Sequence, residues 1–137
     1  MSDNPKDINI SNANLTGNNI VIGGIQAFWG AVHNVLGNVT IGNVTTTPED
    51  TAALRDLIAQ LETELKKAEA GEHDAAILLA ERAKETVEAA TKANPDKKGV
   101  ESKVNLLKEA AENIQGALPV VFAIAMQIVV RIVKLGL

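Results

Sequence analysis

The sequence TPEDTAALRDLIAQLETEL, residues 47–65, sets the class of fold for the larger part of the chain. Thr47 can cap a helix N-terminus, Pro48 fits the first helical position, and acids follow at the next two positions, where N–H groups are exposed. Leucine and isoleucine then recur at the helical period on one face, at Leu54, Leu57, Ile58, Leu61 and Leu65. The pattern predicts an amphipathic helix that begins at Pro48 and stops near Gly71.

The same periodicity predicts two further helices toward the C-terminus. One covers about residues 74–93, has a stripe made mostly of alanine, and ends at Asn94-Pro95. The other covers about residues 97–115, with Asp96 as its expected cap. Because the connections are short, neighbouring helices are expected to run antiparallel. An alanine face also lets an adjacent helix approach closely.

A fourth helical stretch, residues 117–130, is apolar nearly all round, with Pro119 in its first turn. Gln127, Arg131 and Lys134 line up as a narrow polar stripe on its C-terminal half. Its candidate core or membrane residues are Val120, Phe122, Ile124, Ile128, Arg131 and Lys134. Three interpretations stay open: the central helix of a bundle, a membrane span, or a helix buried in one state and released to lipid or a partner in another.

The N-terminal segment has a different composition, since residues 8–47 contain no Asp, Glu, Lys or Arg. Short β-branched clusters recur there between Asn and Gly, at residues 8–10, 20–22 and 39–41. The last two clusters are imperfect copies offset by 19 residues, the distance from Gly23 to Gly42. Alternating Ile and Val predict short strands, with glycines where a turn or a close backbone approach is needed.

Strands this short bury too little surface to be stable alone, and no charge protects their edges from pairing with other chains. We therefore expect self-association through this segment, which also holds the only tryptophan. The candidate self-assembly residues are Ile20, Ile22, Gly23, Phe28, Trp29, Val39, Ile41 and Gly42. The predicted fold class is α+β, with a β-solenoid or cross-β-like segment over residues 1–47 and an antiparallel bundle of about four helices over residues 48–137.

The two Gly/Asn-containing units, residues 17–24 and 37–43, resemble the amyloid signalling motifs of bacterial and fungal prion-type proteins. In those families the motif passes a β-solenoid or cross-β fold from a receptor to a helical effector that attacks membranes. The alanine-rich helices with a hydrophobic last helix are similar in outline to such effectors. The resemblance implies a receptor with a similar β motif, and a membrane, as further partners.

Composition disfavours several classes of function. The net charge of −4 leaves no basic stripe for nucleic acid, and the absence of cysteine removes thiol chemistry and thiolate metal sites. His33 and His73 have no candidate ligands at metal spacing, and no nucleophile–base set or phosphate loop is present in the sequence. We expect no enzyme, no cofactor and no metal. Residues 1–10 lack the pattern of a secretory signal, so the expected location is the cytoplasm, with membrane association only on activation.

Two functional hypotheses follow. In the first, the protein is a bacterial immune or cell-death effector, in which the N-terminal segment drives homo-oligomerisation and the last helix acts on a membrane or partner. In the second, it is a structural scaffold that forms a fibre or ring through its N-terminal segment. Both make the protein its own principal partner.

Overall fold

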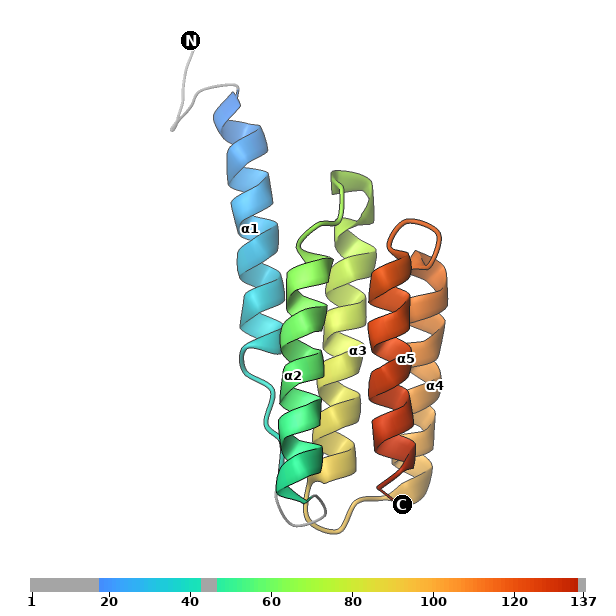
Figure 1. Cartoon of the computed structure of the whole chain (residues 1–137). Coiled ribbons are helices and arrows are strands. Elements are labelled where there is room, and N and C mark those ends of the chain that lie inside the picture. Colours follow the sequence, from blue (N-terminus) through green and yellow to red (C-terminus); the bar gives the residue numbers. More distant parts are fainter. Residues whose placement is uncertain (1–17, 43–46, 136–137) are drawn as a thin grey trace. The chain divides into compact units, whose positions relative to one another are not determined.

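The structure is a computed structural model that describes the backbone of residues 18–42 and 47–135, and the side chains of residues 25–42 and 47–135. These residues form helices and no β-strand (Figure 1). The elements are α1 (Asn18–Leu36), α2 (Pro48–Leu65), the 3-10 helix η1 (Ala70–Glu72), α3 (His73–Thr91), α4 (Lys97–Ile114) and α5 (Pro119–Val133). The predicted α+β fold is therefore wrong, and the described part of the chain is all-helical.

Helices α2 to α5 form an antiparallel bundle, as the stripes in residues 48–133 predicted. α5 lies between α2 and α4, and α4 packs along α3, so successive neighbours close most of a four-helix ring (Figure 1). α2 and α3 contact each other much less than the other neighbouring pairs do. The side chains buried from α2 are the five predicted from its stripe: Leu54, Leu57, Ile58, Leu61 and Leu65.

The helix ends agree in part with the predicted signals. The Thr47 hydroxyl accepts a hydrogen bond from the Asp50 N–H at 3.1 Å, which confirms the cap of α2. Asp96 occupies the cap position of α4, but its side chain makes no capping hydrogen bond. α2 ends at Leu65 instead of near Gly71, because the following backbone tightens into i, i+3 hydrogen bonds that bring Ala68 into the core.

The strand predicted over residues 20–22 is wrong, because these residues lie within α1. Isoleucine and valine cost less than about 0.7 kcal/mol per residue in a helix, so packing of one helical face outweighs their strand preference. The buried side chains of α1 are Phe28, Val32 and Leu36, which recur at i, i+4 and i+8. The segment thus has a helical period in addition to its β-branched clusters.

The strand predicted over residues 39–41 is also absent, and this stretch has no regular secondary structure. Its N–H groups bond to side chains of α3 instead of to a second strand: the Thr40 N–H donates to Glu88 Oε2 at 2.9 Å, and the Gly42 N–H donates to Thr91 Oγ1 at 3.0 Å. Ile41 is buried while Thr40 is exposed. The alternation of buried and exposed side chains in this stretch therefore arises from packing on a helix and not from pairing in a sheet. The cluster at residues 8–10 lies outside the described residues.

The chain divides into two compact units, residues 1–31 and 32–137, so the division falls inside α1. The predicted boundary at residue 47 lies within the second unit. Residues 32–42, which the sequence placed with the N-terminal segment, belong with the bundle.

The alanine stripe of α3 packs as its composition predicted. Ala76, Ala80, Ala83 and Ala90 are all fully buried, and α3 makes its closest association with α4. Thr86 is buried at the same seam, where its hydroxyl lies 2.6 Å from the Arg82 carbonyl and 3.2 Å from that of Lys103 on α4. A buried hydroxyl needs such a partner, so it fixes the register of α3 on α4.

Gly42 is needed where it stands, because a Cβ there would collide with the backbone carbonyl of Thr91. We expect Gly42→Ala to lower the free energy of unfolding by about 1–3 kcal/mol, the usual cost of an overpacked contact. Gly71→Ala is the matched control, since a Cβ at Gly71 has open space around it. Urea unfolding followed by circular dichroism measures both variants. Equal stability of the two would show that the contact at Gly42 yields without cost.

Candidate functional site

The segment formed by residues 32–42, here called the strap, joins the end of α1 to both α2 and α3. On α2, His33 Nδ1 lies 3.0 Å from Glu62 Oε2. On α3, the strap backbone donates to Glu88 and Thr91, as described above. Its apolar side chains Val32, Leu36 and Ile41 are buried. α2 and α3 contact each other little, and the strap is hydrogen-bonded to both.

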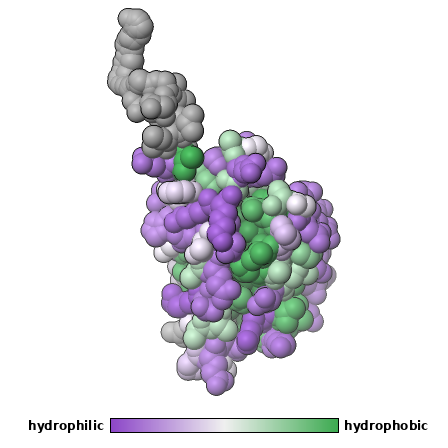
Figure 2. Space-filling model, turned by 45° about the horizontal axis from the view of Figure 1, so that its top comes forward, coloured by the Kyte–Doolittle hydropathy of each residue, from purple (hydrophilic) through white to green (hydrophobic). Residues whose placement is uncertain are grey.

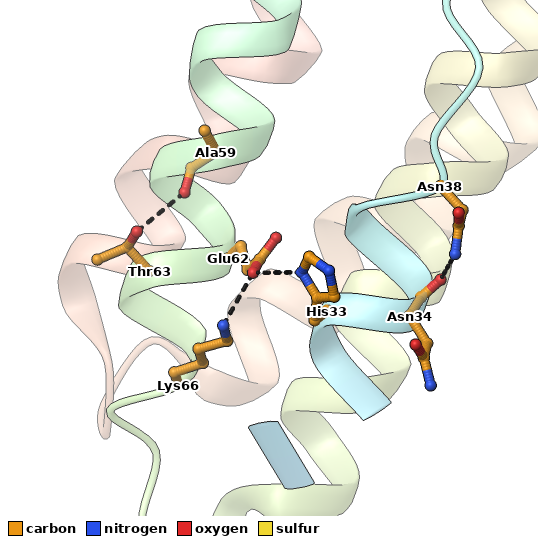
Figure 3. A network of polar contacts seen from close by, with 7 residues as sticks. All are labelled: His33, Asn34, Asn38, Ala59, Glu62, Thr63 and Lys66. Carbon is orange, nitrogen blue, oxygen red and sulfur yellow. Dashed lines mark hydrogen bonds and ion pairs between the residues drawn. The ribbon is translucent and has the colours of Figure 1, made fainter. Parts of the chain in front are cut away.

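Glu62 is the polar centre of the strap's attachment to α2. Figure 3 shows His33 from α1 and Lys66 from the C-terminal cap of α2 converging on its carboxylate. The Lys66 Nζ donates to the same Oε2 at 2.9 Å. A carboxylate can only accept, so His33 donates from Nδ1. Partial burial alone would raise the pKa of Glu62, but the hydrogen bonds and charges of Lys66 and His33 outweigh it and hold that pKa below its usual 4.5.

The lowered pKa of Glu62 gives the strap a pH dependence of known sign. A carboxyl whose pKa is depressed by folding stabilises the folded state above its unfolded value, and this contribution is lost as the pH falls below 4.5 through the folded pKa. We expect Glu62→Gln to lower the free energy of unfolding near neutral pH by about 1 kcal/mol or less, because such partly exposed pairs are weak. The difference from the parent protein should shrink as the pH falls below 4.5.

Glu85→Gln is the control for this titration, since Glu85 pairs with Arg82 at 3.3 Å within α3 and not with His33 or Lys66. Urea unfolding across the acidic range measures all three proteins. A gap between Glu62→Gln and the parent that stays constant with pH would contradict the assignment.

Described residues of the second unit line at least three surface grooves. The first, of about 410 Å³, runs between α2 and α5; its buried floor is Ile124, and exposed Ala59, Thr63, Val120, Ala123 and Gln127 are among its walls. The second, also about 410 Å³, lies between α4 and α5 and includes Lys97 and Glu101. The third, about 440 Å³, lies along the strap and is lined mainly by charged residues.

Apolar side chains also reach the surface, both inside and outside these grooves. On the face drawn in Figure 2, hydrophobic residues gather in a patch bordered by hydrophilic ones. The exposed large apolar residues are Ile25, Trp29, Leu78, Leu106, Val120, Val130 and Val133. Trp29 has 46% of its surface exposed and Ile25 has 39%. These two residues stand four apart on α1 and therefore share one face of that helix.

The structure distributes the predicted self-assembly residues over two environments. Ile20, Ile22 and Gly23 lie within α1, which also carries Phe28, buried, and Trp29, exposed. Val39, Ile41 and Gly42 belong to the strap, where Ile41 is buried. The two sequence copies therefore form no common strand face.

The predicted residues of the last helix divide by face. Ile124 and Ile128 are buried in the bundle, together with Val121, Ala125, Val129 and Ile132. Val120 is 53% exposed, and Phe122 is half-buried. Gln127, Arg131 and Lys134 are exposed, as their stripe predicted, and Arg131 Nη1 lies 3.9 Å from Asp50 Oδ1 on α2. In this structure the bundle itself covers the apolar face of α5.

Sequence reasoning missed the residues that hold the strap, namely Glu62, Glu88 and Thr91. The i, i+4 spacing of Glu62 and Lys66 is readable from the sequence, and their ion pair at 2.9 Å follows from it. The partners of the strap lie 29 to 49 positions away along the chain, so no local pattern pairs them. The groove between α2 and α5 could not be predicted from the sequence either, because its alanines and glutamines form no recognisable motif.

Metal and membrane sites were sought as well. Within residues 18–42 and 47–135, no group of three or more His, Cys, Asp or Glu side chains is placed to hold a metal ion. None of the described helices is both long enough and apolar enough to cross a bilayer.

The described residues thus define a small helical-bundle protein whose α1 ends in a strap on the bundle. No protein-family model, curated protein or solved structure matches the chain.

Proposed function

We propose that this protein is a non-enzymatic self-association module, in which α1 binds to other copies of the chain and the α2–α5 bundle is the folded domain attached to α1. The observation that carries the proposal is the exposure of Trp29, the only tryptophan, on a helix that has no Asp, Glu, Lys or Arg. Tryptophan is the residue type most enriched among those that dominate binding energy at interfaces. Ile25 adds a second apolar contact on the same face.

The charge distribution supports association between identical copies. Like charges that meet at an interface between two copies repel, and residues 8–47 contain no Asp, Glu, Lys or Arg side chain to do so. The bundle carries most of the acids and bases of the chain, mainly at exposed positions, which keeps the rest of its surface hydrated. Association is therefore expected to concentrate on α1.

The effector hypothesis would add a membrane-acting C-terminal helix to this assembly. It requires α5 to leave the bundle, which would expose six buried apolar side chains, among them Ile124 and Ile128. Exposing each of the five larger side chains to water costs roughly 1.5–3 kcal/mol. The module is accordingly proposed as a scaffold or adaptor, with the bundle intact.

Trp29→Lys tests the proposal directly. We expect the parent protein to have a solution mass that is a multiple of 14.4 kDa and the variant to have the monomer mass, because the lysine puts a charge on the associating face. Leu78→Lys is the control, since Leu78 is also exposed, but on α3. Light scattering during size-exclusion chromatography measures all three. A monomeric parent, or a Trp29→Lys variant with the parent's mass, would refute the proposal.

A further inference from the structure

We propose that α1 of one copy docks in the groove between α2 and α5 of a second copy. This inference rests on the proposed self-association and names the surface that receives α1. The occupant is a helix of the same chain, argued from the charges on both surfaces and from the sizes of the side chains in the groove.

The groove has the form that a helix needs. α2 and α5 lie side by side along it (Figure 1). Its floor is the buried Ile124, and two of its walls are the small residues Ala59 and Ala123. Small side chains allow another helix to approach closely, and large ones can then insert between them. The exposed Val120 adds apolar surface at one end.

The polar groups of the groove need no charged partner. Glu64 is its only charged side chain, and it already pairs with Lys67, whose Nζ lies 3.1 Å from Glu64 Oε2. The Thr63 hydroxyl donates to the Ala59 carbonyl at 3.1 Å, within α2 (Figure 3). Gln60 and Gln127 remain, and their amides can both donate and accept. A helix without Asp, Glu, Lys or Arg can therefore cover the groove without burying an unpaired charge.

The other two grooves do not match α1 in this way. The groove between α4 and α5 contains both Lys97 and Glu101, and the groove along the strap contains Glu85, Glu88, Lys92 and Lys103. An uncharged helix docked on either would remove charges from water without supplying partners, which is costly. The α2–α5 groove is the one of the three whose charge is already neutralised.

Helix α1 supplies the complementary surface. It has no Asp, Glu, Lys or Arg over its whole length. Ile25 and Trp29 stand one turn apart on one face and can insert beside Ala59 and Ala123, while Gln26 next to them offers an amide to the glutamines of the groove. Large apolar side chains thus meet small ones, and amides meet amides.

Crosslinking between single-cysteine variants tests the docking, because the chain has no cysteine of its own. Gln26→Cys, bearing an affinity tag, is mixed with untagged Gln127→Cys and treated with a short bis-maleimide. The control replaces Gln127→Cys with Ser102→Cys, an exposed position on α4. We expect the yield of the mixed crosslinked dimer to be about tenfold higher with Gln127→Cys than with this control, because docking raises the local concentration of the two thiols.

A second variant tests the groove without a crosslinker. Ala123→Arg places a charge in the groove at an exposed position, so the bundle should fold while the dissociation constant of self-association rises about tenfold or more. Ala52→Arg, also exposed on α2 but outside the groove, should leave the constant unchanged. Circular dichroism confirms the fold of both variants.

The outcomes separate this inference from the proposed function. If the parent self-associates and Trp29→Lys abolishes it, but Ala123→Arg has no effect and the crosslink yield equals the Ser102→Cys control, the groove is wrong and self-association through α1 stands. If the parent is monomeric, both proposals fail. A specific crosslink together with weakened association of Ala123→Arg supports both.

Discussion

Replacing Ile128 with alanine is expected to lower the free energy of unfolding by about 2–5 kcal/mol, because the side chain is completely buried in the bundle and its removal leaves a cavity. Val130→Ala, two residues along the same helix, is the matched control. Val130 is 49% exposed, so its truncation should change stability by no more than about 0.5 kcal/mol. Urea unfolding followed by circular dichroism measures the difference.

The pair of variants also distinguishes the three interpretations of the last helix. If lipid or another subunit covered α5, the stability of the isolated bundle would not depend on Ile128 more than on Val130. A difference smaller than about 0.5 kcal/mol between the two variants would therefore show that the cover of α5 is not intramolecular. Ile128→Asp extends the test, since an unpaired buried charge should abolish the folded bundle.

The second large effect is expected at the seam between α3 and α4. Ala83→Leu adds bulk to a side chain that is fully buried where α3 lies along α4. Inserting methylenes into a packed core typically costs about 1–3 kcal/mol. The cost of Ala83→Leu should lie at the upper end of this range, because Ala76 and Ala80 are also fully buried and the two helices would have to move apart along this whole stretch.

Ala52→Leu controls for the added apolar surface and the change in helix propensity, because Ala52 is exposed on α2. Its stability should stay within about 0.5 kcal/mol of the parent. Thermal unfolding monitored by circular dichroism compares the two. Should Ala83→Leu melt at the temperature of Ala52→Leu, α3 and α4 would have to be separated more widely than the buried alanines indicate.

The helices of residues 48–133 could be predicted from the sequence because each has a stripe of apolar residues at the helical period and local signals at its ends. The stripe of α2 gave its buried residues, and Thr47-Pro48 gave its start. One predicted helix end was wrong. The end of α2 at Leu65 depends on Ala68 turning back into the core, a contact that no terminator residue announces.

The N-terminal segment could not be predicted from its composition, because its sequence fits two periods. Ile20, Val21 and Ile22 read as a strand, yet Phe28, Val32 and Leu36 bury one helical face. Strand preference is worth no more than about 1 kcal/mol and depends on having a partner strand. Among the described residues no such strand exists, so helical burial decided the outcome.

The candidate site shows the same division. The exposed polar stripe of Gln127, Arg131 and Lys134 followed from spacing alone. The strap did not, because its hydrogen bonds join residues 29 to 49 positions apart and use the side chains of Glu62 and Thr91 as acceptors. The groove between α2 and α5 depends on which helices become neighbours.

The sequence by itself determined that residues 48–133 form helices whose apolar faces must be covered, and that residues 8–47 contain no Asp, Glu, Lys or Arg. Only the tertiary structure decided that the bundle covers α5, that residues 18–36 are helical, and that residues 39–42 lie on α3 as part of the strap. The physical reason is that periodicity fixes which face of an element is apolar, whereas the partner of that face is chosen by packing between distant parts of the chain.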